Sequence, residues 1–131
     1  MRNRLTHTAF TLVELVMVIV IIGLLAAVVM PKFFDIKTEA QSAAEEGAVA
    51  AVRSGIKLAH MSNLAKGSDT YPSSLDSASV GDASESNPIF TEVIDGGVTD
   101  GNWEKTSSGY RYKPSANTYT YTSGTGVFTR S

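Results

Sequence analysis

The 131-residue sequence carries a formal net charge of −2 and contains no cysteine. The mild negative charge and the lack of a basic tract interleaved with aromatic residues argue against a nucleic-acid partner. The absence of cysteine excludes disulfides, thiolate metal sites and cysteine nucleophiles. The length allows one small domain with a long helix or tail attached, and without disulfides that domain must be stabilised by packing, by a metal or by assembly.

The chain opens with a short polar segment, residues 1–9, in which Arg2 and Arg4 are basic, and an apolar run then occupies residues 10–30. Glu14 is the one charged side chain in that run. At a rise of about 1.5 Å per residue, a helix over residues 10–30 spans about 31 Å, which matches the ~30 Å hydrocarbon core of a bilayer. The run can be a secretory signal, a single-pass anchor or an apolar assembly helix, but it exceeds the usual signal core and lacks a small-residue cleavage site after it.

The helical pattern continues beyond Pro31, so residues 10–66 are predicted to form one helix about 85 Å long. Pro31 lacks a main-chain donor and predicts a kink or local loosening, and Gly23 is a second weak point. Gly67 is placed to close the helix in the left-handed conformation.

Two sets of residues recur at three- and four-residue steps in the second half of this helix, which makes it amphipathic. Most of their members are small, and small residues allow a sheet or a neighbouring helix to approach the backbone closely. We expect close packing within the subunit, with a neighbouring helix as the alternative. The first set is Phe33, Ile36, Ala40, Ala43, Ala44, Gly47, Ala51 and Ser54, and the second is Ala48, Val52, Ile56 and Ala59.

The remainder, residues 67–131, divides into a loop region and a C-terminal part typical of an antiparallel sheet. Turn-forming residues dominate 67–100, where 89–94 is predicted to be a short helix or a strand. Alternating runs at 109–113, 118–122 and 127–129 predict strands. The expected fold class is therefore α+β, with a long N-terminal helix, apolar in its first half and amphipathic in its second, packed on a small C-terminal antiparallel sheet.

The tyrosines of these strands, Tyr110, Tyr112, Tyr119 and Tyr121, alternate along the chain and are expected to form cross-strand and core pairs. An aromatic ligand platform is the alternative. His7 and His60 are the two histidines, and no nucleophile, phosphate-binding or dinucleotide motif accompanies them, so neither an enzyme nor a cofactor is expected.

A glycine-rich acidic loop at 95–102 offers Asp95, Asp100 and Asn102 as oxygen ligands for calcium. Its spacing does not match the EF-hand loop, and Asp-Gly pairs are common in tight turns. The turn interpretation is favoured, and the calcium site is a weak candidate.

The run Ala9-Phe10-Thr11-Leu12-Val13-Glu14, with the basic leader before it and the apolar segment after it, resembles the type IV prepilin signature. Gly23 and Pro31 also lie where many pilins have a glycine and a proline. The resemblance is close over residues 1 to about 35, and beyond them it rests on architecture. One departure is Ala9, because the family usually has glycine at this position.

The resemblance implies that a prepilin peptidase cleaves between Ala9 and Phe10 and that the new amine of Phe10 is N-methylated. It also implies that Glu14 pairs with the Phe10 ammonium of an adjacent subunit or of its own chain, which would set the axial register of a filament. The alternative is that Glu14 lies near enough to the membrane surface to reach the headgroups.

The function implied is a structural one. The mature chain would wait in the inner membrane of a bacterium as a single-pass protein in the lipid bilayer. An inner-membrane assembly platform would then build it into a homo-oligomeric helical filament, either at the cell surface or spanning the periplasm. A pseudopilin of a type II secretion system is the alternative, and a monomeric membrane-tethered binding module is a second one. The poor match of Asp100-Gly101-Asn102-Trp103 to the Asp-Pro-Trp-Gly stretch of major pseudopilins weighs against the first of these.

Overall fold

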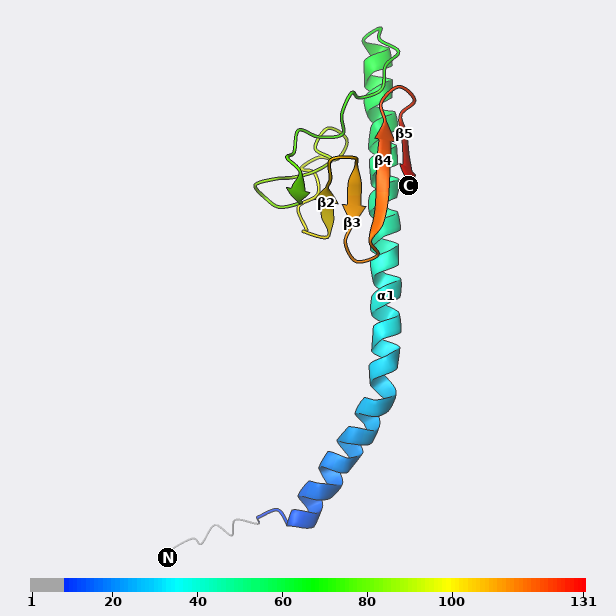
Figure 1. Ribbon diagram of the computed structural model, residues 1–131. Coiled ribbons are helices and arrows are strands. Elements are labelled where there is room, and N and C mark those ends of the chain that lie inside the picture. Colours follow the sequence, from blue (N-terminus) through cyan, green and yellow to red (C-terminus); the bar gives the residue numbers. More distant parts are fainter. Residues whose placement is uncertain (1–8) are drawn as a thin grey trace, which may run out of the picture. The chain divides into compact units, whose positions relative to one another are not determined.

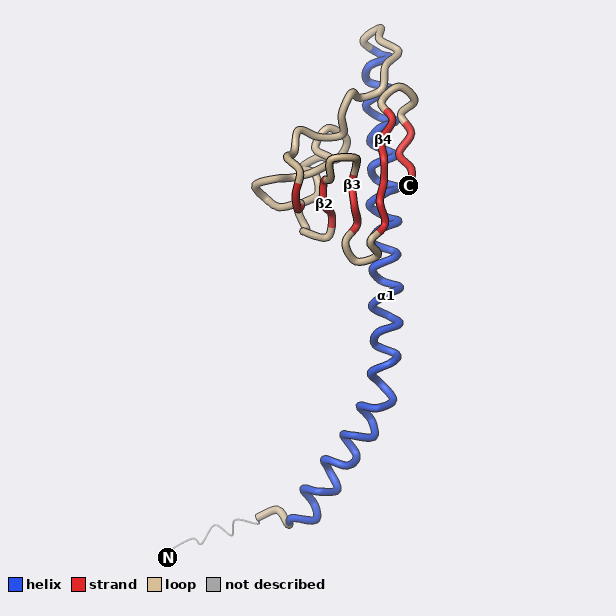
Figure 2. The backbone as a smooth tube through the Cα atoms, in the orientation of Figure 1, coloured by secondary structure: helices blue, strands red, loops and turns tan. Residues whose placement is uncertain are grey.

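The computed structural model describes residues 9–131, so Arg2, Arg4 and His7 lie outside the described residues. The chain divides into two compact units, Met1–Glu39 and Ala40–Ser131. One helix, α1 (Leu12–Ala65), belongs to both, and all strands belong to the second unit (Figures 1 and 2). We call the second unit the head.

The C-terminal end of α1 has a clear chemical cause. At the C-terminus Gly67 has a φ of 85°, and its N–H donates to Leu64 O at 2.9 Å while Ser68 N–H donates to Asn63 O at 2.9 Å. This pair of bonds is the Schellman closure, which satisfies carbonyls that the helix leaves free. Between its ends α1 runs through Gly23 and Pro31 without interruption.

Five strands form one antiparallel sheet in the order β1-β2-β3-β4-β5. Each strand pairs with the next one along the chain, as in a meander, with Tyr110 opposite Tyr119 between β3 and β4 and Tyr121 opposite Phe128 between β4 and β5. The strands are β1 (Gly81–Asp82), β2 (Trp103–Lys105), β3 (Tyr110–Tyr112), β4 (Asn117–Thr122) and β5 (Val127–Arg130). The predicted α+β class is confirmed, while β1 and β2 lie in or beside the segment that was predicted to be loop.

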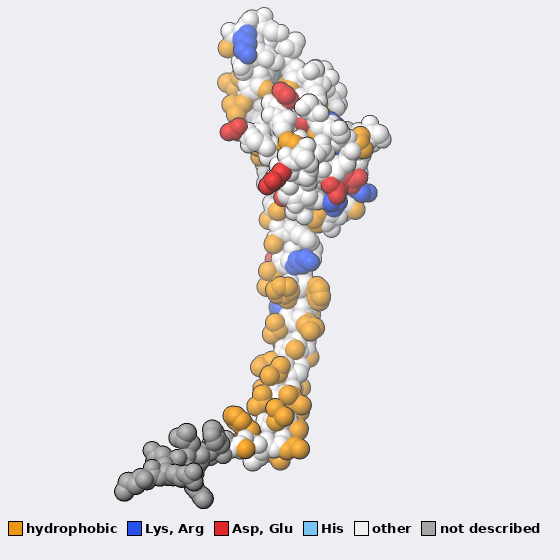
Figure 3. Space-filling view, turned by 90° about the vertical axis from the view of Figure 1, so that its left-hand side faces the viewer, with side chains coloured by type: hydrophobic (Ala, Val, Ile, Leu, Met, Phe, Trp, Pro, Cys, Tyr) orange, Lys and Arg blue, Asp and Glu red, His pale blue; other side chains and the backbone are white. Residues whose placement is uncertain are grey.

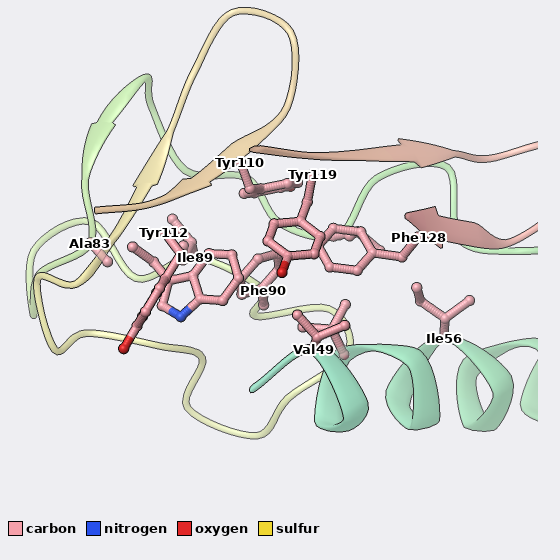
Figure 4. Packing of buried hydrophobic residues seen from close by; sticks show 12 residues of the cluster. Val49, Ile56, Ala83, Ile89, Phe90, Tyr110, Tyr112, Tyr119 and Phe128 are labelled. Carbon is pink, nitrogen blue, oxygen red and sulfur yellow. The ribbon is translucent and has the colours of Figure 1, made fainter. Parts of the chain in front are cut away.

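Alternation along the strands places aromatic side chains toward the helix (Figure 4). Tyr110, Tyr112 and Tyr119 are buried, and Phe128 stacks on Tyr119 with ring centroids 5.4 Å apart. The helix contributes Val49, Val52 and Ile56 to the same core, which also contains Phe90 and Trp103. Tyr110, Tyr112 and Tyr119 are therefore core and cross-strand residues, and the aromatic-platform interpretation is wrong for these three.

A buried carboxylate fixes the sheet against α1. Glu45 Oε1 accepts hydrogen bonds from Tyr119 Oη at 2.6 Å and from Asn117 Nδ2 at 2.8 Å. Burial raises the pKa of Glu45, but these hydrogen bonds together with the charge of Arg130 lower it by more, so the net pKa lies below its ordinary value. Burial and the neighbouring Glu45 carboxylate raise the pKa of Tyr119 to about 12.

A second buried carboxylate organises the loop. Asp76 Oδ2 accepts from Phe90 N–H at 3.0 Å and from Tyr110 Oη at 2.9 Å, and Asp76 Oδ1 accepts from Lys105 Nζ at 2.5 Å. Phe90 is fully buried with a φ of 62°, a left-handed conformation that is rare for a bulky residue. This conformation turns the chain after Ile89, which pairs only with Val98 in an isolated bridge. The prediction of a short helix or strand over 89–94 is therefore wrong.

The turn that follows Phe90 approaches α1 at a glycine. Gly55 is buried, and a Cβ added to it would overlap the backbone carbonyl of Val93. Gly47, two turns earlier on the same helix, has no atom within 4 Å of the place where its Cβ would lie. The close approach of helix and turn therefore requires glycine at 55 and not at 47.

We expect Gly55→Ala to lower the free energy of unfolding by about 1–3 kcal/mol, because the added methyl must displace the backbone of Val93. The matched control, Gly47→Ala, should raise it by about 0.5–1 kcal/mol, since alanine is the better helix former and meets nothing there. Denaturant unfolding of the full chain in detergent micelles, followed by the fluorescence of buried Trp103, measures both. Equal stability of Gly55→Ala and wild type would contradict the close packing.

A second prediction concerns pH. The folded-state pKa of Tyr119 lies above the ordinary value of 10.0, so its contribution to stability is complete below pH 10 and is lost as the pH rises through about 12. For Glu45 the folded pKa is lowered, so its contribution is present above the unfolded value of 4.5 and is lost as the pH falls below it. Tyr119→Phe should cost about 1.5–3 kcal/mol at neutral pH, as expected for a hydrogen bond to a charged group, and should flatten the alkaline decline.

The measurement is thermal unfolding of the full chain from pH 4 to 12, with tyrosinate absorbance recorded in parallel. Tyr71→Phe serves as the control, because its hydroxyl makes no hydrogen bond among residues 9–131. An unchanged alkaline profile in Tyr119→Phe would refute the role given to the Glu45–Tyr119 pair.

Candidate functional site

The N-terminal part of α1 is covered by nothing in the described part of the chain. Its large apolar side chains have exposed fractions from 44% at Val16 upward, and Phe10, just before the helix, reaches 89%. Hydrophobic side chains dominate the face of this part of the helix that Figure 3 shows. By length and composition α1 is the one helix in residues 9–131 that could cross a membrane. An apolar surface of this extent marks a lipid or protein interaction site.

Glu14, the charge in this apolar surface, belongs to a capping box. Its Oε2 accepts from Thr11 N–H at 2.9 Å and from Thr11 Oγ1 at 3.1 Å, while Thr11 Oγ1 accepts from Glu14 N–H at 3.2 Å. These reciprocal bonds satisfy donors that a helix start otherwise leaves free. The carboxylate also lies at the positive end of the helix dipole. Glu14 is therefore stabilised within its own turn.

The cap explains why α1 begins at Leu12 and not at the predicted Phe10, because Thr11 occupies the N-cap position. The sequence contains the signal, because a threonine is followed three residues later by a glutamate. The apolar run alone predicts an earlier start. The nitrogen of Phe10 is a peptide nitrogen here, so pairing of Glu14 with a Phe10 ammonium stays a prediction.

The peptide bond between Ala9 and Phe10 lies outside the helix. Both residues are exposed and have no regular secondary structure. A protease needs an extended, accessible backbone, and helix α1 begins only after this bond. The geometry is therefore compatible with the predicted cleavage.

In the head, the sheet covers only one face of α1. The residues in contact with it, Glu45, Val49, Val52 and Ile56, lie three or four positions apart. The opposite face carries residues that are all exposed and that alternate at steps of four and three. They form what we call the uncovered stripe: Ala40, Ala44, Gly47, Ala51, Ser54, Leu58, Met61 and Ala65.

The expectation that the small residues pack within the subunit holds for Ala48 and Gly55, but the uncovered stripe corrects it for the small residues that the stripe contains. The predicted second set is the one that faces the sheet, with Val52 and Ile56 buried and Ala48 partly buried. Of the first set, the members from Ala40 to Ser54 are exposed. A strict repeat of seven with small residues is typical of a helix that packs closely against another helix. The uncovered stripe thus fits the alternative, a neighbouring helix.

The candidate calcium loop contains tight turns. Gly96, Gly97 and Gly101 all have positive φ, and Asp100 accepts hydrogen bonds from the backbone and the side chain of Asn102. Neither Asp100 nor Asn102 is bonded to Asp95, and no group of three or more acidic, histidine or cysteine side chains within residues 9–131 is arranged to hold a metal.

Comparison with known proteins gives one informative similarity. A segment of 50 residues is 48% identical to the type IV narrow pilus major component PilA5 of Thermus thermophilus. The segment is 38% of this chain and 43% of the relative, so the match spans less than half of that protein. No family model and no solved structure matches the chain.

This similarity agrees with the prepilin-like motif and with the architecture. A long N-terminal helix, apolar and exposed in its first half, carries a head with an antiparallel sheet on the helix's second half. The fold is α+β and pilin-like, and the resemblance to type IV pilins that the sequence predicts is confirmed.

Proposed function

We propose that this chain is the structural subunit of a type IV pilus-like filament, in which it polymerises through α1. The observation that carries the proposal is the apolar part of α1, whose large side chains are covered by nothing among residues 9–131. The similarity to a major pilus component supports it.

The proposed pathway has two stages, processing in the membrane and assembly into the filament. In the first, the apolar helix spans the inner membrane once, and the leader with Arg2 and Arg4 stays on the cytoplasmic side. There a prepilin peptidase cuts between Ala9 and Phe10, and the amine of Phe10 is methylated. The exposed, non-helical backbone at this bond supports access by the peptidase.

In the second stage an assembly platform in the membrane moves the mature chain from lipid into the filament. A helix bonds all of its own backbone groups, so it can pass from lipid to a bundle of apolar helices without unpaired donors. The uncovered stripe would receive a helix of a neighbouring copy, because its small residues let two backbones approach closely.

Glu14 would change partners between these stages. In the membrane it caps its own helix through Thr11. In the filament, the ammonium of the mature Phe10 on an adjacent copy, or on the same chain, would pair with it. A carboxylate in an apolar core without a partner is strongly unfavourable, so this pairing would select one axial register.

A structural role leaves no chemistry for the chain to perform, and we propose neither an enzymatic activity nor a cofactor. A pseudopilin of a type II secretion system would use the same helix and the same cap. A tethered binding module would keep its leader and form no filament. The uncovered stripe argues against this alternative, because a monomer does not need a helix face suited to packing against another helix.

The first experiment is intact mass and N-terminal sequencing of material sheared from the surface of cells that make the protein. We expect a chain that begins at Phe10 and carries one added methyl group. A full-length chain recovered from membranes alone would reject the filament and support the tethered module.

Substitutions at Glu14 separate its two roles. Glutamine at this position still supports a capping box but carries no charge, whereas alanine supports neither. If Glu14 pairs with the Phe10 ammonium, Glu14→Gln should reduce the yield of sheared filaments about as strongly as Glu14→Ala, by about tenfold or more, with processed subunit still in the membrane.

Thr11→Ala is the matched control, because it removes the capping hydroxyl and leaves the charge. It should lower helix stability by about 1 kcal/mol and leave filaments largely intact. Near-normal assembly of Glu14→Gln would show that capping is all that Glu14 supplies.

A further inference from the structure

Charge is unevenly distributed along the chain after the helix. Residues 67–104 contain eight Asp and Glu residues and no Lys, Arg or His. Residues 105–131 contain four Lys and Arg residues and no Asp or Glu. The acidic segment includes the loops and the first two strands, and the basic segment includes the last three strands with the end of β2.

Three ion pairs between the two segments neutralise part of this charge. Lys105 pairs with Asp76 at 2.5 Å, Arg111 with Glu104 at 2.6 Å and Lys113 with Asp82 at 2.9 Å. His60 of the helix lies 3.5 Å from Asp69, and Asp100 bonds to Asn102 in its own turn.

The remaining carboxylates are those of Glu85, Glu92 and Asp95, and we define the acidic flank as the turn that carries Glu92 and Asp95. All three are exposed, and none has a side-chain hydrogen bond or an ion pair within residues 9–131. The turn with Glu92 and Asp95 is held by backbone bonds from Ile94 N–H to Phe90 O and from Gly97 N–H to Ile94 O, both 2.9 Å. Figure 3 views the head from the loop side and shows several acidic side chains on it.

The opposite side of the head forms a basic flank, which we define as Arg53, Lys57 and Arg130. Arg53 Nε donates to Phe128 O at 3.0 Å, and Lys57 follows one helical turn later. Arg53 and Arg130 line a cleft of about 480 Å³ beside edge strand β5, together with Glu45 and Glu46. Glu45 and Glu46 offset two of the three positive charges of Arg53, Lys57 and Arg130, so the basic flank with its cleft keeps a net charge of +1.

The helix separates the two flanks. Arg53 and Gly55 are two residues apart, which places them about 200° apart around the helix axis. Arg53 contacts Phe128 on the basic flank, and Gly55 contacts Val93 in the turn that carries Glu92 and Asp95. The flanks therefore cannot neutralise each other within one head.

We infer that the acidic flank of one copy binds the basic flank of the next. Two complementary surfaces on opposite sides of one molecule form a head-to-tail contact, and such contacts produce open helical arrays when they do not close into a ring. Complementary charges also orient partners and fix their register. The inference rests on the proposed filament and names which surfaces of neighbouring heads meet in it.

Charge reversal in the full chain tests this contact. Lys57→Glu with Arg130→Glu makes both flanks acidic, and Glu92→Lys with Asp95→Lys makes both basic. Each double variant should reduce the yield of sheared filaments by about tenfold or more, because like charges then face each other. Lys66→Glu, the same kind of charge change at the end of α1 and outside the basic flank, should assemble like wild type.

The four substitutions combined in one chain restore opposite charges and should recover filaments. The two double variants produced in the same cell should also recover them, as a filament in which the two subunits alternate. Processed subunit in the membrane and the unfolding midpoint in micelles establish that each variant folds. If the reversal on one flank impairs folding, the other flank decides the result.

The outcomes separate this inference from the filament itself. No filaments from wild type would reject the proposed function. Filaments from wild type and in equal yield from both double variants, or no recovery on combining well-folded ones, would overturn the contact between flanks.

Discussion

The dominant constraint on this chain is an apolar helical segment that the fold of residues 9–131 does not bury. The helix satisfies its backbone internally, so the side chains alone demand an apolar environment, and lipid or other helices supply it equally well. The one charge in the segment is placed where the helix can tolerate it, because Glu14 accepts from Thr11 at the positive end of the dipole. The cap also satisfies donors that would otherwise be unpaired in an apolar environment.

The head depends on the same helix in a different way. Two buried carboxylates, Glu45 and Asp76, hold the sheet and the loop through hydrogen bonds. Loss of these bonds would leave a buried charged group unsatisfied and would lower the stability of the fold. Tyr119 and Asn117, the partners of Glu45, hold the sheet on one face of α1, and the loop packs against the same helix at Gly55. The other face is left with small residues at a seven-residue period. Because the sheet packs on one face of α1, the opposite face is free to contact another helix.

In the proposed filament, two kinds of surface would contribute to recognition between copies. Apolar contacts along helices are strong but carry little directional information, since their strength depends mainly on buried area. Charged groups on the flanks of the head would add little net affinity to the proposed contact but would discriminate between orientations. A filament subunit needs both properties, because it must bind its neighbours firmly and in one register.

Much of this was predictable from local pattern. The helix follows from a long apolar run and a continued three- and four-residue period, and strands β3 to β5 follow from alternation of aromatic and polar residues. The capping box is encoded by Thr11 and Glu14, although the apolar run by itself predicts a helix that begins at Phe10. Strands β1 and β2 were not predictable, because Gly81–Asp82 and Trp103–Lys105 are short, mostly charged and lack the alternation of aromatic and polar residues seen in β3, and they become strands only by pairing.

The sequence by itself determined which segments are helical, which alternate as strands and where an apolar surface must be covered, because each of these properties is set by neighbours a few residues away. Only the tertiary structure decided which face of α1 the sheet covers. Two stripes on the helix have the same period, and the choice between them depends on Asn117 and Tyr119, which reach Glu45 across 72 and 74 residues of chain. The left-handed turn at Phe90 has the same origin, since it is held by Asp76 from a distant part of the loop.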